Sequence, residues 1–95
     1  MQFLFAMQVR ENAPPITADQ LEREVAYVRE IYASDTLRQI WSRTDVTGAC
    51  LLIEAESENT ARAAIDELPL MKAGKLEIQT FMALRSYRGF AGGSR

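Results

Sequence analysis

The chain contains 95 residues, of which 47% are hydrophobic and 25% are charged, and its formal net charge is -2. This composition is typical of a folded globular protein of one domain, and the small negative charge argues against the basic surface that nucleic-acid binding requires. No apolar run reaches the ~20 residues that span a bilayer, and the N-terminus lacks a signal-peptide pattern. We therefore expect a cytoplasmic protein with one domain at residues 1–88, a flexible tail at 89–95, and neither nucleic-acid nor membrane partners.

The first predicted element is a β-strand near the N-terminus. Aromatic and apolar side chains there recur at every second position, at Phe3, Phe5, Met7 and Val9. Such alternation is typical of a strand with one buried face. Two adjacent prolines in segment 11–16 can neither extend a strand nor lie far inside a helix, so this segment is predicted to be a loop.

A helix is predicted to begin after Thr17 and to run to about Ser34. Thr17 and Gln20 have the spacing of a capping box, in which two side chains satisfy free backbone N–H groups at the start of a helix. Apolar residues then recur at steps of three and four, and we expect this stripe to cover a sheet: Ala18, Leu21, Val25, Val28 and Tyr32. On the helical wheel Glu24 lies about 60° from Leu21, at the margin of the stripe.

The rest of the chain is predicted to form two strands, a second helix and a last strand. The two strands span residues 37–44 and 49–54, joined by a turn around Gly48. Ser57 caps the second helix, Pro69 ends it, and alternating side chains indicate a long strand at 75–84. The order βαββαβ predicts an α+β, ferredoxin-like fold with helices on one antiparallel sheet. The third strand is apolar at consecutive positions, and burial of both its faces would require a partner subunit, which predicts a dimeric α+β barrel.

Glu24 is the candidate catalytic acid or base. A carboxylate at the margin of the stripe can lie against the sheet in a poorly hydrated space, where burial raises its pKa toward neutrality. The alternative is a surface glutamate that bends into water or pairs with a strand arginine.

The candidate substrate-binding residues are Arg38, Trp41 and Arg43 on the second strand and Tyr27 on the first helix. If Trp41 faces a cavity, Arg43 shares its face, because side chains alternate along a strand. A guanidinium beside an indole can hold a carboxylated, unsaturated ligand, and Tyr27 would shape the pocket. The alternative is a tryptophan in the core and arginines in solvent.

The sequence does not support a metal or cofactor site. The chain has no histidine, and Cys50 is its single cysteine. It also lacks a glycine-rich phosphate-binding loop. We therefore expect neither a metal nor a cofactor, and Cys50 is expected to act as a small buried hydrophobic residue.

Four segments together resemble the muconolactone Δ-isomerase family over roughly residues 1–85. They are the opening MQFLFAMQV, the helix segment EREV that contains Glu24, the pair Ile40-Trp41, and Leu68-Pro69-Leu70. The resemblance implies small dimeric α+β barrels that assemble into larger rings and shift a double bond within a lactone without a cofactor. It also implies that Glu24 takes part in the proton shuttle. The sequence departs from the family at Ser42, where an arginine usually follows the tryptophan, and at Val25, which replaces a lysine.

The function predicted from these features is a cofactor-independent isomerase acting on a small unsaturated lactone or related carbonyl compound. Glu24 would act as acid and base, and the protein would form a homodimer or a larger ring-like homo-oligomer. Two alternatives remain open. One is a cofactor-free oxygenase or cyclase acting on a polyketide-like ligand, and the other is a non-catalytic small-molecule-binding module.

Overall fold

The computed structural model describes residues 1–89, so the tail expected at 89–95 lies, beyond its first residue, outside the described residues. The elements follow the order β1 (Gln2–Val9), α1 (Ala18–Ala33), β2 (Leu37–Ser42), β3 (Gly48–Glu54), α2 (Glu58–Asp66), α3 (Pro69–Lys72) and β4 (Leu76–Leu84). The strands form one sheet in the order β2-β3-β1-β4, and every neighbouring pair is antiparallel. The predicted ferredoxin-like α+β fold is therefore confirmed, with α3 as an additional single turn of helix.

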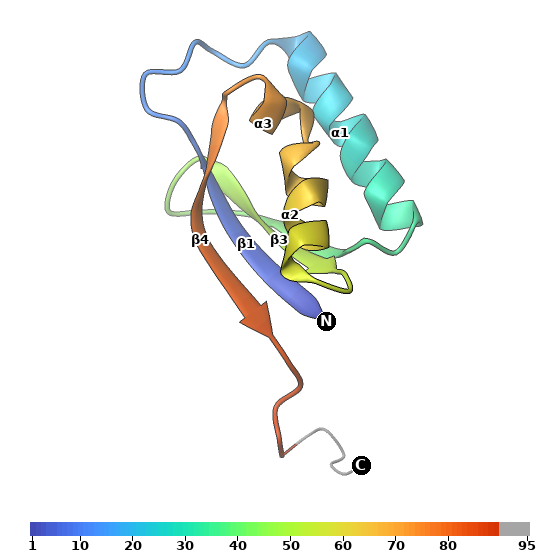
Figure 1. Ribbon diagram of the computed structural model, residues 1–95. Coiled ribbons are helices and arrows are strands. Elements are labelled where there is room, and N and C mark those ends of the chain that lie inside the picture. The colour runs from blue at the N-terminus through green and yellow to red at the C-terminus, as the bar shows by residue number, and fades with distance from the viewer. Residues whose placement is uncertain (90–95) are drawn as a thin grey trace.

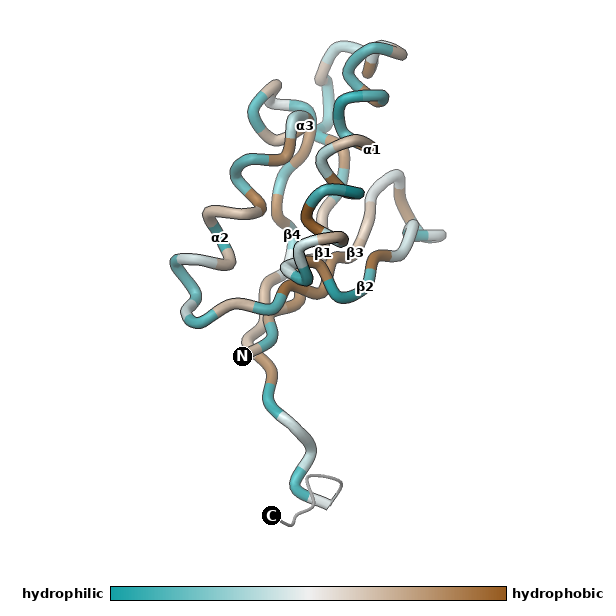
Figure 2. Tube along the Cα trace, turned by 90° about the vertical axis from the view of Figure 1, so that its right-hand side faces the viewer, coloured by the Kyte–Doolittle hydropathy of each residue, from teal (hydrophilic) through white to brown (hydrophobic). Residues whose placement is uncertain are grey.

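All three helices cover the same face of the sheet, and residues 85–89 extend away from the body of the molecule (Figure 1). The core lies between these two layers. Its largest fully buried side chains come from every strand except β4, from α2 and from the turn after α2: Phe3, Phe5, Met7, Leu37, Ile53, Ile65 and Leu68. Hydrophobic and hydrophilic residues alternate along α1 and α2, as expected for helices with one buried face (Figure 2). Among the described residues, no helix is long and apolar enough to cross a membrane.

Strand β1 is central, and its alternation separates the two faces of the sheet. Phe5 pairs with Leu51 of β3 and with Phe81 of β4, and these side chains belong to the face that the helices cover. Leu4 pairs with Leu52 and Met82, which lie on the opposite, uncovered face. We call this second surface the open sheet face. It consists of side chains that the helices of the same chain do not contact.

The buried side of α1 differs from the predicted apolar stripe. The capping box of Thr17 and Gln20 forms as expected, so the start of the helix is correctly predicted. Leu21, Val25 and Tyr32 are nevertheless exposed by 53%, 41% and 61% of their surfaces, whereas Ile31 is buried. The prediction was wrong in phase, because α1 packs against α3 as well as the sheet and is turned toward the side that carries Glu24 and Ile31.

The segment after α2 also differs from the prediction. Ser57 caps α2 by accepting a hydrogen bond from the Thr60 backbone N–H, as expected. Pro69 then does more than end a helix, because it occupies the first turn of α3. A proline is well accommodated there, since the first N–H groups of a helix have no partner within the helix. Helix α3 was not predicted from the sequence.

Candidate functional site

A cavity of about 440 Å³ lies between α1 and the sheet. Most of its lining is apolar and comes from β1, α1, β3 and the α3 region, including Met7, Val28, Ala49, Leu51, Leu68 and Leu70. The volume falls within the range of small-molecule sites, which are mostly apolar with a few placed polar groups. Leu21, Val25 and Ile40 line the cavity and are partly exposed, so they mark its mouth between α1 and the edge strand β2.

Glu24 projects from α1 into this cavity. Its Oε1 accepts a hydrogen bond from the Leu70 backbone N–H at 3.0 Å. Within the described residues, Oε2 has no hydrogen-bond partner, yet no buried side-chain oxygen or nitrogen there is left unsatisfied. Oε2 is therefore open to the cavity. Burial raises the pKa of the Glu24 carboxyl, and the Leu70 N–H opposes this by stabilising the carboxylate.

Helix α3 positions the donor to Glu24. Pro69 begins the helix, which leaves the N–H of Leu70 without a partner within α3. The Leu70 carbonyl in turn accepts a hydrogen bond from the Lys75 N–H at 2.9 Å, so both backbone polar groups of Leu70 are engaged. Leu70 was not predicted from the sequence to be a functional residue. The available signal was the Leu-Pro-Leu segment, because proline favours the first helical position.

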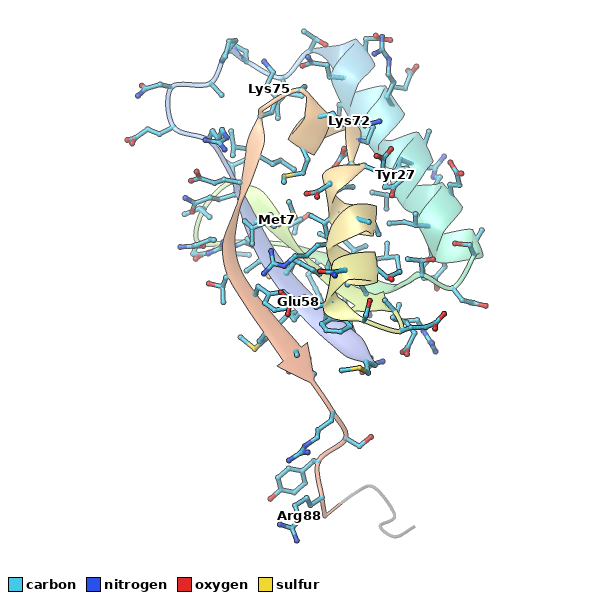
Figure 3. All side chains as sticks on the ribbon, viewed as in Figure 1. Met7, Tyr27, Glu58, Lys72, Lys75 and Arg88 are labelled. Carbon is cyan, nitrogen blue, oxygen red and sulfur yellow. The ribbon has the colours of Figure 1, made fainter. Side chains whose placement is uncertain are left out.

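Tyr27 lies on the side of α1 that faces α2 (Figure 3), and it does not line the cavity. Its hydroxyl donates a hydrogen bond to the Ala64 carbonyl at 2.8 Å. Burial raises the pKa of this hydroxyl, which favours the protonated form that can donate. In this chain Tyr27 joins the two helices and does not line the cavity.

Trp41 and Arg43 share a face, as expected, but that face is the open sheet face. Trp41 pairs with Cys50 and is 46% exposed. The Arg43 guanidinium binds Asp45 through two hydrogen bonds and also donates to Gln79 on β4. These contacts place both side chains away from the cavity between helices and sheet.

Arg38 also lies apart from the cavity, and Cys50 is only partly buried. The Arg38 guanidinium is 3.8 Å from the Glu54 carboxylate, and both side chains are partly exposed. Of the five predicted site residues, Glu24 alone lines the cavity, so one chain does not bring the predicted group together.

Within residues 1–89, no group of three or more His, Cys, Asp or Glu side chains could hold a metal ion.

Other polar residues of the cavity wall were not anticipated. Arg29 on α1, Ser42 at the end of β2 and Thr47 before β3 all line it. Arg29 follows Val25 by one helical turn, and it was not part of the predicted apolar stripe. The turn of α1 toward Glu24 moves the row Leu21, Val25 and Arg29 outward to the edge of the cavity, and periodicity alone does not determine that turn.

The structure is similar to two solved enzymes. One is 5-chloro-2-hydroxyhydroquinone dehydrochlorinase from Burkholderia phenoliruptrix in complex with 2,5-dihydroxybenzoquinone, with a TM-score of 0.75 and 20% sequence identity over 94% of this chain and 98% of that chain. The other is muconolactone isomerase, with a TM-score of 0.76 and 18% identity over 96% of this chain and 95% of that chain. No protein-family model matches the chain, and no curated protein matches it in sequence.

At these identities the likeness establishes the fold and leaves the reaction to be argued from the site. The four segments that suggested the resemblance lie on β1, α1, β2 and the α2–α3 junction, which are elements of the matched fold. The resemblance is therefore confirmed at the level of the fold, and this chain is a divergent protein of the muconolactone isomerase-like α+β fold.

Proposed function

We propose that this protein is a cofactor-independent enzyme that moves a proton and a double bond in a small unsaturated lactone or related carbonyl compound. The observation that carries the proposal is the Glu24 carboxylate, which lies in a largely apolar cavity and is oriented by one backbone N–H. A carboxyl with a pKa raised toward neutrality can both accept and return a proton. The fold shared with an isomerase and a dehydrochlorinase supports a reaction on a small molecule.

The proposed reaction uses Glu24 twice. Its carboxylate removes a proton from a carbon beside the substrate carbonyl, so a C–H bond breaks and an O–H bond forms on Oε2. The electron pair of the broken bond enters an enolate that is conjugated with the existing double bond. The same carboxyl then returns the proton to the far carbon of this system, so the double bond moves and no oxidant or reductant is consumed.

The test follows the proton with α-angelica lactone as the probe, a small lactone whose double bond can move into conjugation with its carbonyl. In deuterium oxide, the wild-type protein is expected to accelerate both isomerisation and incorporation of deuterium, measured by proton NMR. Glu24→Gln retains an oxygen that can accept from Leu70 but cannot take up the proton, so it is expected to lower both rates by at least about 100-fold.

Glu22→Gln is the matched control, because Glu22 is an exposed glutamate on the same helix and does not line the cavity. It is expected to retain the wild-type rates. Wild-type rates in Glu24→Gln would refute the role of Glu24. Saturable binding of the probe without proton exchange in the wild-type protein would refute the isomerase and favour the non-catalytic binding module.

We further propose that two copies pair through the open sheet face, as the predicted dimeric barrel requires. Trp41 and Met82 on this face are 46% and 43% exposed, and Leu4, Cys50 and Leu52 beside them are only partly buried. Pairing would remove this apolar surface from water. The cavity lies on the opposite side of the sheet, so each copy would keep its own cavity mouth.

A further inference from the structure

The charged residues of the cavity occupy two different depths. Of the described residues that line it, Glu24 and Arg29 alone are charged. Glu24 is partly buried and bound to Leu70, whereas Arg29 is exposed. Arg29 continues the row of Leu21 and Val25, whose exposed side chains mark the mouth. The cavity thus has a carboxylate on its inner wall and a cation at its entrance.

Arg29 differs from the other arginines of the folded body, residues 1–84, because it has no carboxylate partner. The other five are Arg10, Arg23, Arg38, Arg43 and Arg62, and each lies within 4.0 Å of an acidic side chain. Among the described residues, Arg29 forms neither an ion pair nor a hydrogen bond through its side chain.

The local sequence explains why Arg29 is unpaired. Arg23 and Arg62 each pair with an acidic residue four positions earlier on the same helix. The positions four before and four after Arg29 hold Val25 and Ala33, so the helix offers no such partner. Its five guanidinium N–H donors therefore remain available at the cavity mouth.

We propose that Arg29 binds an anionic oxygen of the substrate at the cavity mouth and thereby selects ring compounds that carry a carboxylate or an ionised enolic hydroxyl. Arg29 and Glu24 are five residues apart, which corresponds to about 7.5 Å along the helix axis and about 140° around it. The two side chains thus leave the helix on different sides, and the long, flexible Arg29 side chain can reach over the mouth toward a small ring beside Glu24. The ring would lie on the apolar wall near Glu24, and its anionic end would point outward. This proposal rests on the proposed function, because it assigns the same cavity to the substrate.

The experiment measures binding, so it does not depend on turnover. Two matched probe pairs differ in charge and little in shape. The first is a butenolide with a carboxymethyl arm and its methyl ester, and the second is 2,5-dihydroxybenzoquinone and its dimethyl ether. Dissociation constants are measured by calorimetry with wild-type protein and with Arg29→Ala, each also in the Glu24→Gln background so that the probes are not converted.

The wild-type protein is expected to bind the anionic member of at least one pair about tenfold more tightly than the neutral member, which corresponds to about 1.4 kcal/mol. A preference within the first pair would identify a carboxylate, and one within the second an ionised hydroxyl. Arg29→Ala is expected to abolish the preference for the anionic probe and to leave the dissociation constant of the neutral probe unchanged. Raising the salt from about 0.01 M to about 1 M should weaken the wild-type preference, because the cation is exposed.

Arg23→Ala is the control, because it removes the same charge from an exposed site on α1 that does not line the cavity. It is expected to keep the preference. The assignment is overturned if the wild-type protein shows no preference in either pair, which includes no binding at all, or if Arg29→Ala keeps it. A charge preference that depends on Arg29 in a protein without proton exchange would refute the isomerase and still support the assignment of Arg29.

Discussion

Replacing Lys75 by methionine tests the contact that holds the β1–α1 loop against the rest of the fold. Lys75 lies where α3 leads into β4 (Figure 3), and only 6% of its surface is exposed. Its ammonium donates to the carbonyls of Pro14 and Pro15 at 2.8 and 3.2 Å. The next residue of that loop, Ile16, lines the cavity. The substitution keeps a flexible apolar stem and removes the charge with its hydrogen bonds.

The expected loss of stability follows from opposing contributions. Hydrogen bonds to a charged group contribute about 1.5–3 kcal/mol each, so two give about 3–6 kcal/mol. Methionine avoids the cost of burying an ammonium, and water can reach the freed carbonyls because Pro14 and Pro15 are exposed. We expect a net loss of about 2 kcal/mol, equivalent to a fall in melting temperature of about 8–16 °C for a domain of this size.

Urea unfolding followed by circular dichroism measures this loss, with all variants at one protein concentration. Lys72→Met is the matched control, because it removes the same charge from an exposed lysine whose ammonium is 2.9 Å from Glu67. A surface pair of this kind contributes less than about 1 kcal/mol. The reasoning is refuted if Lys75→Met unfolds within about 0.5 kcal/mol of the wild-type protein, since the two hydrogen bonds would then contribute nothing beyond the cost of burial.

Other substitutions test the candidate acid, the contact between α1 and α2, and the open sheet face. Burial raises the pKa of Glu24 in the folded protein, so the ionised carboxylate destabilises the fold at high pH. Glu24→Gln should therefore raise the free energy of unfolding at pH 8. Urea titrations should show this increase in stability vanish as the pH falls below the unfolded pKa of about 4.3. Tyr27→Phe leaves the Ala64 carbonyl without its donor and should lower that free energy by about 1 kcal/mol, with unchanged proton exchange in the NMR assay. Trp41→Glu places a charge on the open sheet face and should convert a dimer to a monomer in light scattering; an unchanged mass would contradict pairing through this face.

The order of elements was predictable because each rests on a local signal. The capping side chains of Thr17 and Ser57 determine where two helices start, and both form the expected bonds. Alternation in β1 correctly assigns its buried face. In β4, strict alternation does not assign the faces, because Gln79 is an extra residue that has no partner on β1 between Ile78 and Thr80. This β-bulge exchanges the two faces of the strand beyond it, and no residue type in this stretch indicates where the bulge lies.

The candidate site was predictable only in part, for a related reason. Periodicity places Glu24 at the margin of an apolar stripe. Whether that margin faces the core or the solvent depends on the rotation of the helix about its axis, which its neighbours determine. Here α3 contacts α1, and it is too short to produce a periodic pattern of its own. The Glu24 carboxylate therefore lies inward, where it accepts a hydrogen bond from the Leu70 N–H, and Arg29 lies at the cavity mouth. Trp41 and Arg43 were correctly placed on one face, but the face opposite the cavity could be identified only from the pairing of β2 with β3.

The backbone of Leu70 connects the chemistry of the site with its stability. Its N–H orients Glu24, and its carbonyl accepts from the backbone N–H of Lys75, whose side chain holds the proline loop. A looser loop in Lys75→Met would thus act on the same segment that presents the donor to Glu24. If these contacts are coupled, Lys75→Met should slow proton exchange in the NMR assay even at temperatures where the variant is fully folded. Equal exchange rates in folded Lys75→Met and wild-type protein would show that α3 presents its N–H to Glu24 independently of the loop.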